Sequence, residues 1–199
     1  MKKSYITKEF EKTINGYKEQ KEELNRLFQD KLALLRKENQ NASKEKQIHL
    51  ENQIMPAIAA YESLQCVMSK QEAFDIIHSY VERRAVRSKK IFKLLMRIPN
   101  LYRRVPGIFG KQTPKFFGEK AGFRANEIQV DKNVWRIDMI KCPYHDACVS
   151  YGCPELCCCF CDSDDITYGD LDKNLLWQRT KTLGRGNDCC DFCLKRIDI

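Results

Sequence analysis

The spacing of apolar residues changes once along this chain, near residue 127, and this change restricts the fold more than any other feature. Upstream, apolar residues recur every three or four positions among Lys, Glu and Gln, which is typical of amphipathic helices. In residues 127–141, EIQVDKNVWRIDMIK, Val, Ile and Trp alternate with polar residues, which predicts one strand or a strand pair. We therefore predict an α+β fold, in which N-terminal helices precede an antiparallel sheet covered by helices on one face.

Local signals divide the upstream part into helices. Pro56 is expected to kink a helix or to start its C-terminal portion, because proline lacks the amide donor that a helix interior uses. Ser69 and Glu72 have the spacing of a capping box, which begins a further helix. The predicted helices span residues 5–40, 44–68 and 69–98, and residues 99–126 are predicted to form an irregular or short-helical cover rich in aromatic residues.

Downstream, Pro143 stands where a helix can begin, since proline is favoured at the first helical position. Predicted helices span residues 143–151 and 154–170, and predicted strands 175–180 and 189–197 form a hairpin. The expected organisation is an N-terminal helical extension (1–43), a helical part (44–126) and a Cys-rich α+β part that binds a ligand or catalyses (127–199), with 44–199 forming one domain.

Charge and hydropathy limit the expected location and partners. The start, MKKSYITKEFEK, lacks the apolar core of a secretory signal, and no apolar run approaches the roughly 20 residues of a membrane helix. We therefore expect a cytoplasmic protein with no membrane partner.

Residues 1–134 carry 27 Lys and Arg against 16 Asp and Glu, but apolar residues interrupt the basic clusters at helical spacing. This pattern favours a solvated helix face over a nucleic-acid site. The apolar stripe of helix 5–40 is thin, so that helix is expected to pack on the main body or to mediate a homo-oligomer.

Ten of the eleven cysteines lie between residues 142 and 193. The odd count and three consecutive cysteines argue against a disulfide framework. Two paired-thiol spacings are typical of zinc sites, but one falls on a predicted helix and the other on a predicted strand, where residues three apart face opposite ways. No cofactor is therefore predicted, although zinc or an iron–sulfur cluster stays an alternative. The paired spacings are Cys158–Cys161 and Cys190–Cys193, and the thiols interpreted as small core residues are Cys148, Cys153, Cys157 and Cys159.

Two groups near these cysteines carry candidate chemistry. Cys142 stands at a predicted helix start, where the helix dipole would lower its pKa, and His145 is three residues on. This pair indicates either an activated nucleophile or a packing role. Asp162, Asp164 and Asp165 follow the thiols and could act as a general base, a metal ligand or a helix cap.

The predicted hairpin contains a candidate carboxylate-binding segment. Arg179, Thr180, Thr182 and Gly186 combine guanidinium and hydroxyl groups with a flexible turn, in the sequence RTKTLGRG. Such groups bind a carboxylate through charge-assisted hydrogen bonds. An exposed basic hairpin with no ligand is the alternative interpretation.

An ordered set of motifs runs over residues 47–197: Met55–Leu64 (MPAIAAYESL), Glu72-Ala73, Cys142-Pro143-Tyr144, Gly152–Leu156 (GCPEL), Cys161 with Asp164, Arg179–Gly186 and Cys190-Asp191-Phe192. Together these motifs resemble the L-2-amino-thiazoline-4-carboxylic acid hydrolase family. A weaker similarity links the cysteine and glycine spacing to four-vinyl-reductase small-molecule-binding domains. Both resemblances imply an antiparallel sheet, covering helices and a ligand cavity between them.

The family resemblance implies hydrolytic opening of 2-amino-thiazoline-4-carboxylate to N-carbamoyl-cysteine, a reaction of a small-molecule carboxylate substrate. For this reaction we assign Arg179 as the carboxylate anchor and Asp164 or Asp162 as the base. Cys142 and Cys161 would be a nucleophile and its neighbour or would line the cavity, with Cys190 beside the substrate. Gly186 would permit a close turn, and Asp191 would orient a partner. The alternatives are a non-catalytic small-molecule sensor and a zinc or iron–sulfur protein.

Overall fold

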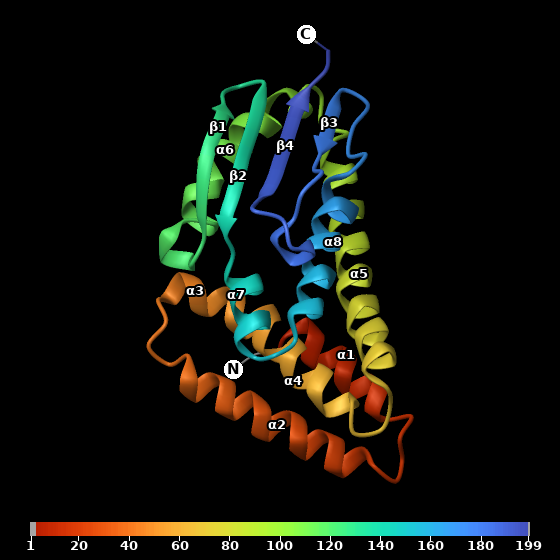
Figure 1. The fold of residues 1–199 in the computed structure, drawn as a ribbon. Coiled ribbons are helices and arrows are strands. Elements are labelled where there is room, and N and C mark those ends of the chain that lie inside the picture. The colour runs from red at the N-terminus through yellow and green to blue at the C-terminus, as the bar shows by residue number, and fades with distance from the viewer. Residues whose placement is uncertain (1–2, 199) are drawn as a thin grey trace.

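The protein is an α+β structure in which helices cover one face of a four-stranded antiparallel sheet, as predicted (Figure 1). The computed structural model describes residues 3–198. The strand order is β1-β2-β4-β3, so the last strand in the sequence lies inside the sheet. The strands are β1 (Arg124–Val130), β2 (Val134–Lys141), β3 (Leu175–Gln178) and β4 (Cys190–Arg196).

Alternation of side chains along β2 gives the sheet one buried face. Trp135, Ile137 and Met139 are buried, whereas the residues between them are more exposed. Because β2 and β4 pair antiparallel, Leu194 lies opposite Trp135 and is fully buried on the same face. The predicted strand over 127–141 is therefore a strand pair, β1 and β2, with its inner face turned toward the helices.

The N-terminal region forms two helices where one was predicted over 5–40. Helix α1 (Tyr5–Ile14) ends at Asn15 and Gly16, and α2 (Lys21–Glu38) begins after a turn. Asn and Gly are poor helix formers, and glycine costs about 1 kcal/mol relative to alanine inside a helix. The chain therefore breaks at this pair and turns back.

The apolar stripe of these two helices is covered within the same chain. Phe10 stacks on Phe28 with ring centroids 4.4 Å apart, and both rings are fully buried. The two helices pack against α4 (Met55–Leu64), as Figure 1 shows at the bottom of the molecule. The stripe thus gives no reason of its own for a homo-oligomer, and that expectation stays a prediction.

The central helices begin where the sequence predicted. Leu50–Ile54 adopts a π-helix, η1, directly before Pro56, so the helical segment changes geometry there as expected. The capping box at Ser69 and Glu72 begins the long helix α5 (Lys70–Leu95). The remaining elements are α3 (Lys44–His49), η2 (Leu101–Arg104), α6 (Val105–Phe116), η3 (Glu119–Ala121), α7 (Pro143–Ser150), η4 (Pro154–Leu156), α8 (Cys157–Tyr168) and η5 (Leu183–Arg185).

Helices α5 and α8 lie side by side (Figure 1), and Trp177 of β3 donates a hydrogen bond to Asp165 of α8 at 2.8 Å. Helix α6 packs on β2 and completes this layer. None of the helices described in residues 3–198 is both long and apolar enough to cross a membrane. The layer of α5, α6 and α8 under the sheet positions the candidate site.

Candidate functional site

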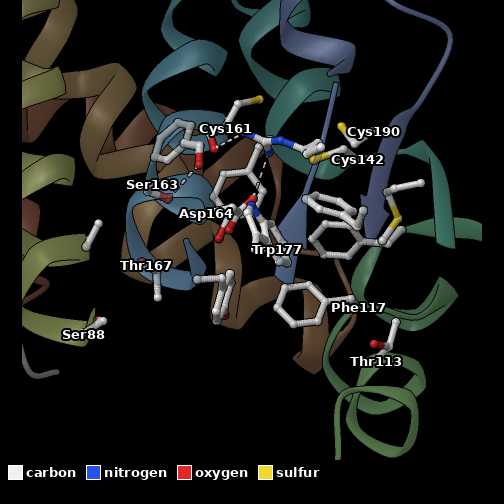
Figure 2. A pocket seen from close by; sticks show the side chains of 18 of the residues that line it. Ser88, Thr113, Phe117, Cys142, Cys161, Ser163, Asp164, Thr167, Trp177 and Cys190 are labelled. Carbon is white, nitrogen blue, oxygen red and sulfur yellow. Dashed lines mark hydrogen bonds and ion pairs between the residues drawn. The ribbon is translucent and has the colours of Figure 1, made fainter. Parts of the chain in front are cut away.

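A cavity of about 330 Å³ lies between the inner face of the sheet and the helices that cover it. Strands β2, β3 and β4 line one side, and α5, α6 and α8 line the other. The cavity therefore lies where the family resemblance implied one. Its volume falls within the range of roughly 300–1,000 Å³ that is common for small-molecule pockets. Figure 2 shows Asp164, Trp177 and three thiols among the side chains that line it.

Asp164 is the ionisable carboxyl group in the wall of this cavity. About 38% of its side-chain surface is accessible, and this surface faces the cavity, where most neighbouring side chains are apolar. Burial raises the pKa of Asp164 from 3.8 to about 7, although the nearby Arg179 guanidinium acts in the opposite direction. Asp164 can therefore exchange a proton near neutral pH, which is what a general base or acid requires.

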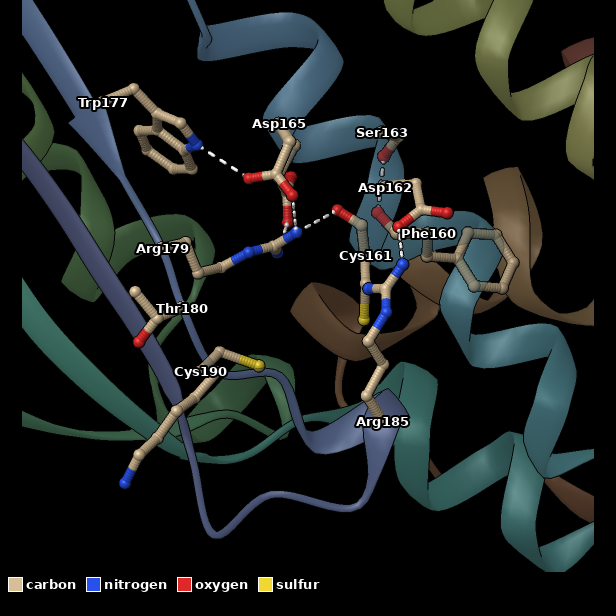
Figure 3. A network of polar contacts seen from close by, with 12 residues as sticks. Phe160, Cys161, Asp162, Ser163, Asp165, Trp177, Arg179, Thr180, Arg185 and Cys190 are labelled. Carbon is tan, nitrogen blue, oxygen red and sulfur yellow. Dashed lines mark hydrogen bonds and ion pairs between the residues drawn. The ribbon is translucent and has the colours of Figure 1, made fainter.

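Arg179 also reaches the cavity wall, but neighbouring protein groups already occupy its guanidinium (Figure 3). Its side chain is only 1% exposed. It donates hydrogen bonds to the Asp165 carboxylate and to the main-chain oxygen of Cys161, the latter at 2.7 Å, and lies 3.5 Å from Asp164. It also lies over the ring of Phe192. These contacts tie the end of β3 to α8 and leave few donors for a substrate carboxylate.

Three thiols predicted for the site line the cavity: Cys142, Cys161 and Cys190. The expectation of a lowered pKa for Cys142 is wrong. Cys142 does precede α7, but burial raises its pKa and outweighs the opposing effect of the backbone amides of His145 and Tyr144. A hydrogen bond with Cys157 raises the pKa of Cys161, and burial raises that of Cys190 to about 12. All three side chains are therefore neutral thiols at physiological pH.

Two polar residues predicted for catalysis lie outside the cavity. Asp162 accepts hydrogen bonds from His78 Nε2 at 3.2 Å and from the Arg185 guanidinium at 2.5 Å (Figure 3). His145 lies beside Asp146, with 3.8 Å between imidazole Nδ1 and the carboxylate, and does not line the cavity. The structure thus separates Asp162 from Asp164 and places the His145 imidazole away from the cavity. Both aspartates lie within α8 and cap no helix.

Apart from Arg179, the hairpin residues predicted for substrate binding (Thr180, Thr182 and Gly186) shape the loop between β3 and β4 and do not line the cavity. Asp191 accepts hydrogen bonds from the amide and hydroxyl of Thr180 and from the amide of Lys181, at 2.6–2.8 Å. Thr182 is buried, and its hydroxyl has no hydrogen-bond partner among the described residues. Gly186 has φ +80°, a left-handed conformation that favours glycine, at the end of η5. These residues hold the loop in place.

The remaining thiols are mostly core residues, as expected for Cys148, Cys153, Cys157 and Cys159, all of which are buried. The thiol of Cys158, which lies on α8, donates a hydrogen bond to the main-chain oxygen of Gly184 at 3.2 Å. In β4, Cys190 is buried and Cys193 is half-buried, which fits opposite faces of a strand. Within residues 3–198, no group of three or more His, Cys, Asp or Glu side chains is arranged to hold a metal ion.

Sequence reasoning missed several polar residues of the cavity, and Arg84 is the most important. Arg84 lies on α5, is half-buried and lines the cavity. It has no ion-pair or hydrogen-bond partner among the side chains and main-chain atoms of residues 3–198. In the sequence it belongs to a basic cluster interpreted as a solvated helix face. The signal that separates it from its neighbours is its position on the helix: Val81, Ala85 and Ser88 share its face of α5 and also line the cavity.

A hydrogen-bond chain in the same wall was also missed. Gln53 donates to the Tyr144 hydroxyl at 2.8 Å, and that hydroxyl lies 3.1 Å from Nδ1 of His49. The other imidazole nitrogen lies 2.9 Å from the main-chain oxygen of Phe116. Since a carbonyl oxygen only accepts, Nε2 carries the hydrogen and Nδ1 accepts from Tyr144. Burial lowers the pKa of His49, so this imidazole is neutral and its orientation is fixed.

The sheet and its helical cover define an α+β protein. Between them lies a ligand-sized cavity, rich in aromatic side chains, whose wall contains a titratable carboxyl group. A family model described as L-2-amino-thiazoline-4-carboxylic acid hydrolase matches residues 47–194. The chain belongs to the L-2-amino-thiazoline-4-carboxylic acid hydrolase family, which confirms the resemblance drawn from its motifs. No curated protein and no solved structure matches the chain.

Proposed function

We propose that this protein is a hydrolase that opens a small cyclic amidine-like carboxylate, such as 2-amino-thiazoline-4-carboxylate, to give N-carbamoyl-cysteine. Its membership of the hydrolase family supports the reaction class. The observation that carries the proposal is the presence, in one cavity, of the titratable carboxyl group of Asp164 and the guanidinium of Arg84, which has no partner among residues 3–198.

Arg84 takes the role of carboxylate anchor in this proposal, in place of Arg179. A guanidinium binds a carboxylate through two parallel hydrogen bonds, provided that other acceptors do not already occupy its donors. Arg179 is occupied by Asp165 and the Cys161 carbonyl, whereas Arg84 faces the cavity without such partners. A bound carboxylate would also neutralise a charge that is half-buried beside aromatic rings.

Asp164 takes the role of general base. Its carboxylate removes a proton from a water molecule as the water oxygen attacks C2, the ring carbon bonded to two nitrogens and sulfur. The electron pair of the C2=N3 double bond goes to N3, and protonated Asp164 donates its proton to that nitrogen. Asp164 then removes the proton of the new hydroxyl group as the C2=O double bond forms and the C2–S bond breaks, with the electron pair of that bond going to sulfur, and it passes this proton to the sulfur. The balance is one water consumed, one hydrogen gained by N3 and one by the released thiol, with Asp164 regenerated.

The cavity thiols act as neutral wall groups in this mechanism. Because the pKa values of Cys142 and Cys161 are raised, thiolate nucleophiles are scarce at neutral pH. The nucleophile is therefore water, and no covalent bond forms between the enzyme and the substrate.

The test is release of free thiol from 2-amino-thiazoline-4-carboxylate, followed with a thiol reagent against a substrate-free control that accounts for the protein's own cysteines. Asp164→Asn is expected to lower kcat by about 10²- to 10⁴-fold. Arg84→Gln is expected to raise KM about tenfold to a hundredfold, since it removes charge-assisted hydrogen bonds.

Asp162→Asn is the matched control, because Asp162 lies on the same helix but outside the cavity. It is expected to retain nearly all activity. No thiol release by the unmodified protein would exclude this substrate, and equal losses in the two aspartate variants would remove the base role from Asp164. Ligand-induced thermal stabilisation without turnover would favour the alternative of a small-molecule sensor.

A further inference from the structure

Helices α5 and α8 carry both the polar groups of the proposed site and aromatic side chains that line the cavity. Phe92 on α5 and Tyr168 on α8 have ring centroids 5.9 Å apart, so these two positions lie at the same level. On α5, Arg84 lies eight residues before Phe92, or about 12 Å along the helix axis. On α8, Asp164 lies one turn, about 6 Å, before Tyr168. Arg84 and Asp164 therefore both precede the Phe92–Tyr168 pair, each along its own helix.

Aromatic side chains from four elements gather around the Phe92–Tyr168 pair. Tyr168 lies 5.2 Å from Phe109 of α6 and 5.1 Å from Trp177 of β3, between ring centroids. Each of these rings, like Phe92, lines the cavity, and Figure 2 labels Trp177 among the lining side chains. We call Phe92, Phe109, Tyr168 and Trp177 the aromatic cage. Such surfaces bind flat apolar groups by burial and by edge-to-face contacts.

The cavity volume exceeds what the unsubstituted ring needs. A cavity of about 150 Å³ is enough to hold benzene, whereas this one measures about 330 Å³. A five-membered ring held by Arg84 and presented to Asp164 would leave the aromatic cage without a ligand group. An apolar surface of this kind inside a binding cavity gains affinity when a ligand covers it.

We infer that the preferred substrate carries an aromatic or alkyl substituent on the exocyclic 2-amino nitrogen, which the aromatic cage binds. This inference rests on the proposed function, since it extends the same site. With the carboxylate at Arg84 and C2 at Asp164, the 2-amino nitrogen is the ring substituent that points farthest from the carboxylate, and the cage begins one turn of α8 beyond Asp164. Water attacks C2 and the C2–S bond breaks as before. The product is a cysteine whose amine carries an N′-substituted carbamoyl group and whose thiol is free.

The test compares kcat/KM for 2-benzylamino-thiazoline-4-carboxylate with that for the 2-amino compound, again by thiol release. Burial of a phenyl-sized group predicts a preference of about tenfold to a hundredfold for the benzyl compound. Phe92→Ala is expected to reduce this preference at least threefold. Phe74→Ala is the matched control, because Phe74 lies on the same helix but stacks on His78 outside the cavity, and it is expected to leave the preference unchanged.

The outcomes separate this inference from the proposed function. Ring opening of both compounds at equal kcat/KM, unaffected by Phe92→Ala, would overturn the aromatic cage and leave the hydrolase standing. The same two compounds are therefore also compared by calorimetric binding to the unmodified protein. If neither is opened but the benzyl compound binds at least tenfold more tightly, the cage is supported and the hydrolase fails. Absence of both binding and turnover would overturn both.

Discussion

Asp164 is set apart from other carboxylates of this protein by its surroundings. Glu9 accepts a hydrogen bond from Lys12, and Asp131 accepts one from the side-chain amide of Gln129, and in each case the pKa is lowered. Asp164 instead faces an apolar cavity, and burial raises its pKa to about 7 despite the nearby Arg179. A raised pKa means that the folded protein holds a proton which the unfolded chain releases.

This difference predicts a pH dependence of stability that belongs to Asp164. Between pH 4 and pH 7 the folded state binds the extra proton, so the contribution of Asp164 to the free energy of unfolding falls as pH rises through this range. Asp164→Asn removes the ionisation, so the variant gains stability relative to the unmodified protein as pH rises from 4 to 7. Denaturant unfolding at pH 5, 6 and 8 measures this gain. Parallel pH profiles for the two proteins would contradict the raised pKa, and Asp162→Asn serves as control.

Arg179 is expected to act chiefly on stability. Arg179→Lys keeps the positive charge but loses the planar fork that joins Asp165 to the Cys161 carbonyl. We expect a loss of about 1–3 kcal/mol in the free energy of unfolding, with little change in KM. Arg185→Lys is the control, because Arg185 is half exposed and pairs with Asp162 outside the cavity; its loss should stay below about 1 kcal/mol. A higher KM with unchanged stability would return the anchor role to Arg179.

At the scale of elements, α5 carries the site. It begins at the capping box, runs beside α8 and places Arg84 and Phe92 on the face that lines the cavity. Its start is fixed by reciprocal hydrogen bonds: the Ser69 hydroxyl accepts from the Glu72 amide, and the Glu72 carboxylate accepts from the Ser69 amide at 2.8 Å. The first turn of α5 is therefore held by the hydrogen bonds of two exposed side chains, Ser69 and Glu72.

Removal of this cap is expected to destabilise the protein without changing the cavity. Ser69→Ala should lower the free energy of unfolding by about 1 kcal/mol, with kcat and KM unchanged. Gln71→Ala in the same turn removes only an exposed hydrogen bond to Asp75 and should cost about 0.2–0.5 kcal/mol. Denaturant unfolding and the thiol-release assay measure the two effects. A loss for Ser69→Ala no larger than that for Gln71→Ala would contradict the role of the cap.

At the scale of the whole molecule, one hydrophobic core joins the helices to the sheet. It extends from Ile6 and Phe10 in α1 through α4 and α5 to Leu194 in β4, and it includes several of the buried cysteines. The thiols thus behave as small apolar residues of a common core. Cys66 is the exposed thiol, in the turn after α4, and Cys142, Cys158 and Cys193 are half-buried.

This arrangement predicts the order in which thiols react. In the native protein an aromatic disulfide reagent should modify Cys66 first, because buried thiols are both inaccessible and poorly ionised. Cys66→Ser should remove the fast phase, and the buried thiols should react only when denaturant unfolds the chain. Stopped-flow absorbance follows both phases. A fast phase that persists in Cys66→Ser would show that the core opens under native conditions.

The order and type of most elements could be predicted from the sequence, because they follow from short-range patterns. The capping box at Ser69, the change of helix at Pro56 and the strand pair after residue 123 are each specified by neighbouring residues. The break at Asn15 and Gly16 was also signalled locally by two poor helix formers, although an apolar period that continued to Tyr17 concealed it.

The identity of the site residues was decided by tertiary structure. Asp162 and Asp164 are two residues apart, so they project about 200° from each other around α8, and one of them at most can face the cavity. Packing of α8 against α5 and the sheet turns Asp164 inward and leaves Asp162 to His78. In the same way, Arg179 meets acceptors on α8 and Arg84 meets none among the described residues. Sequence determines which chemistry is present, but the availability of each group depends on neighbours far away in the chain, which only the folded structure brings together.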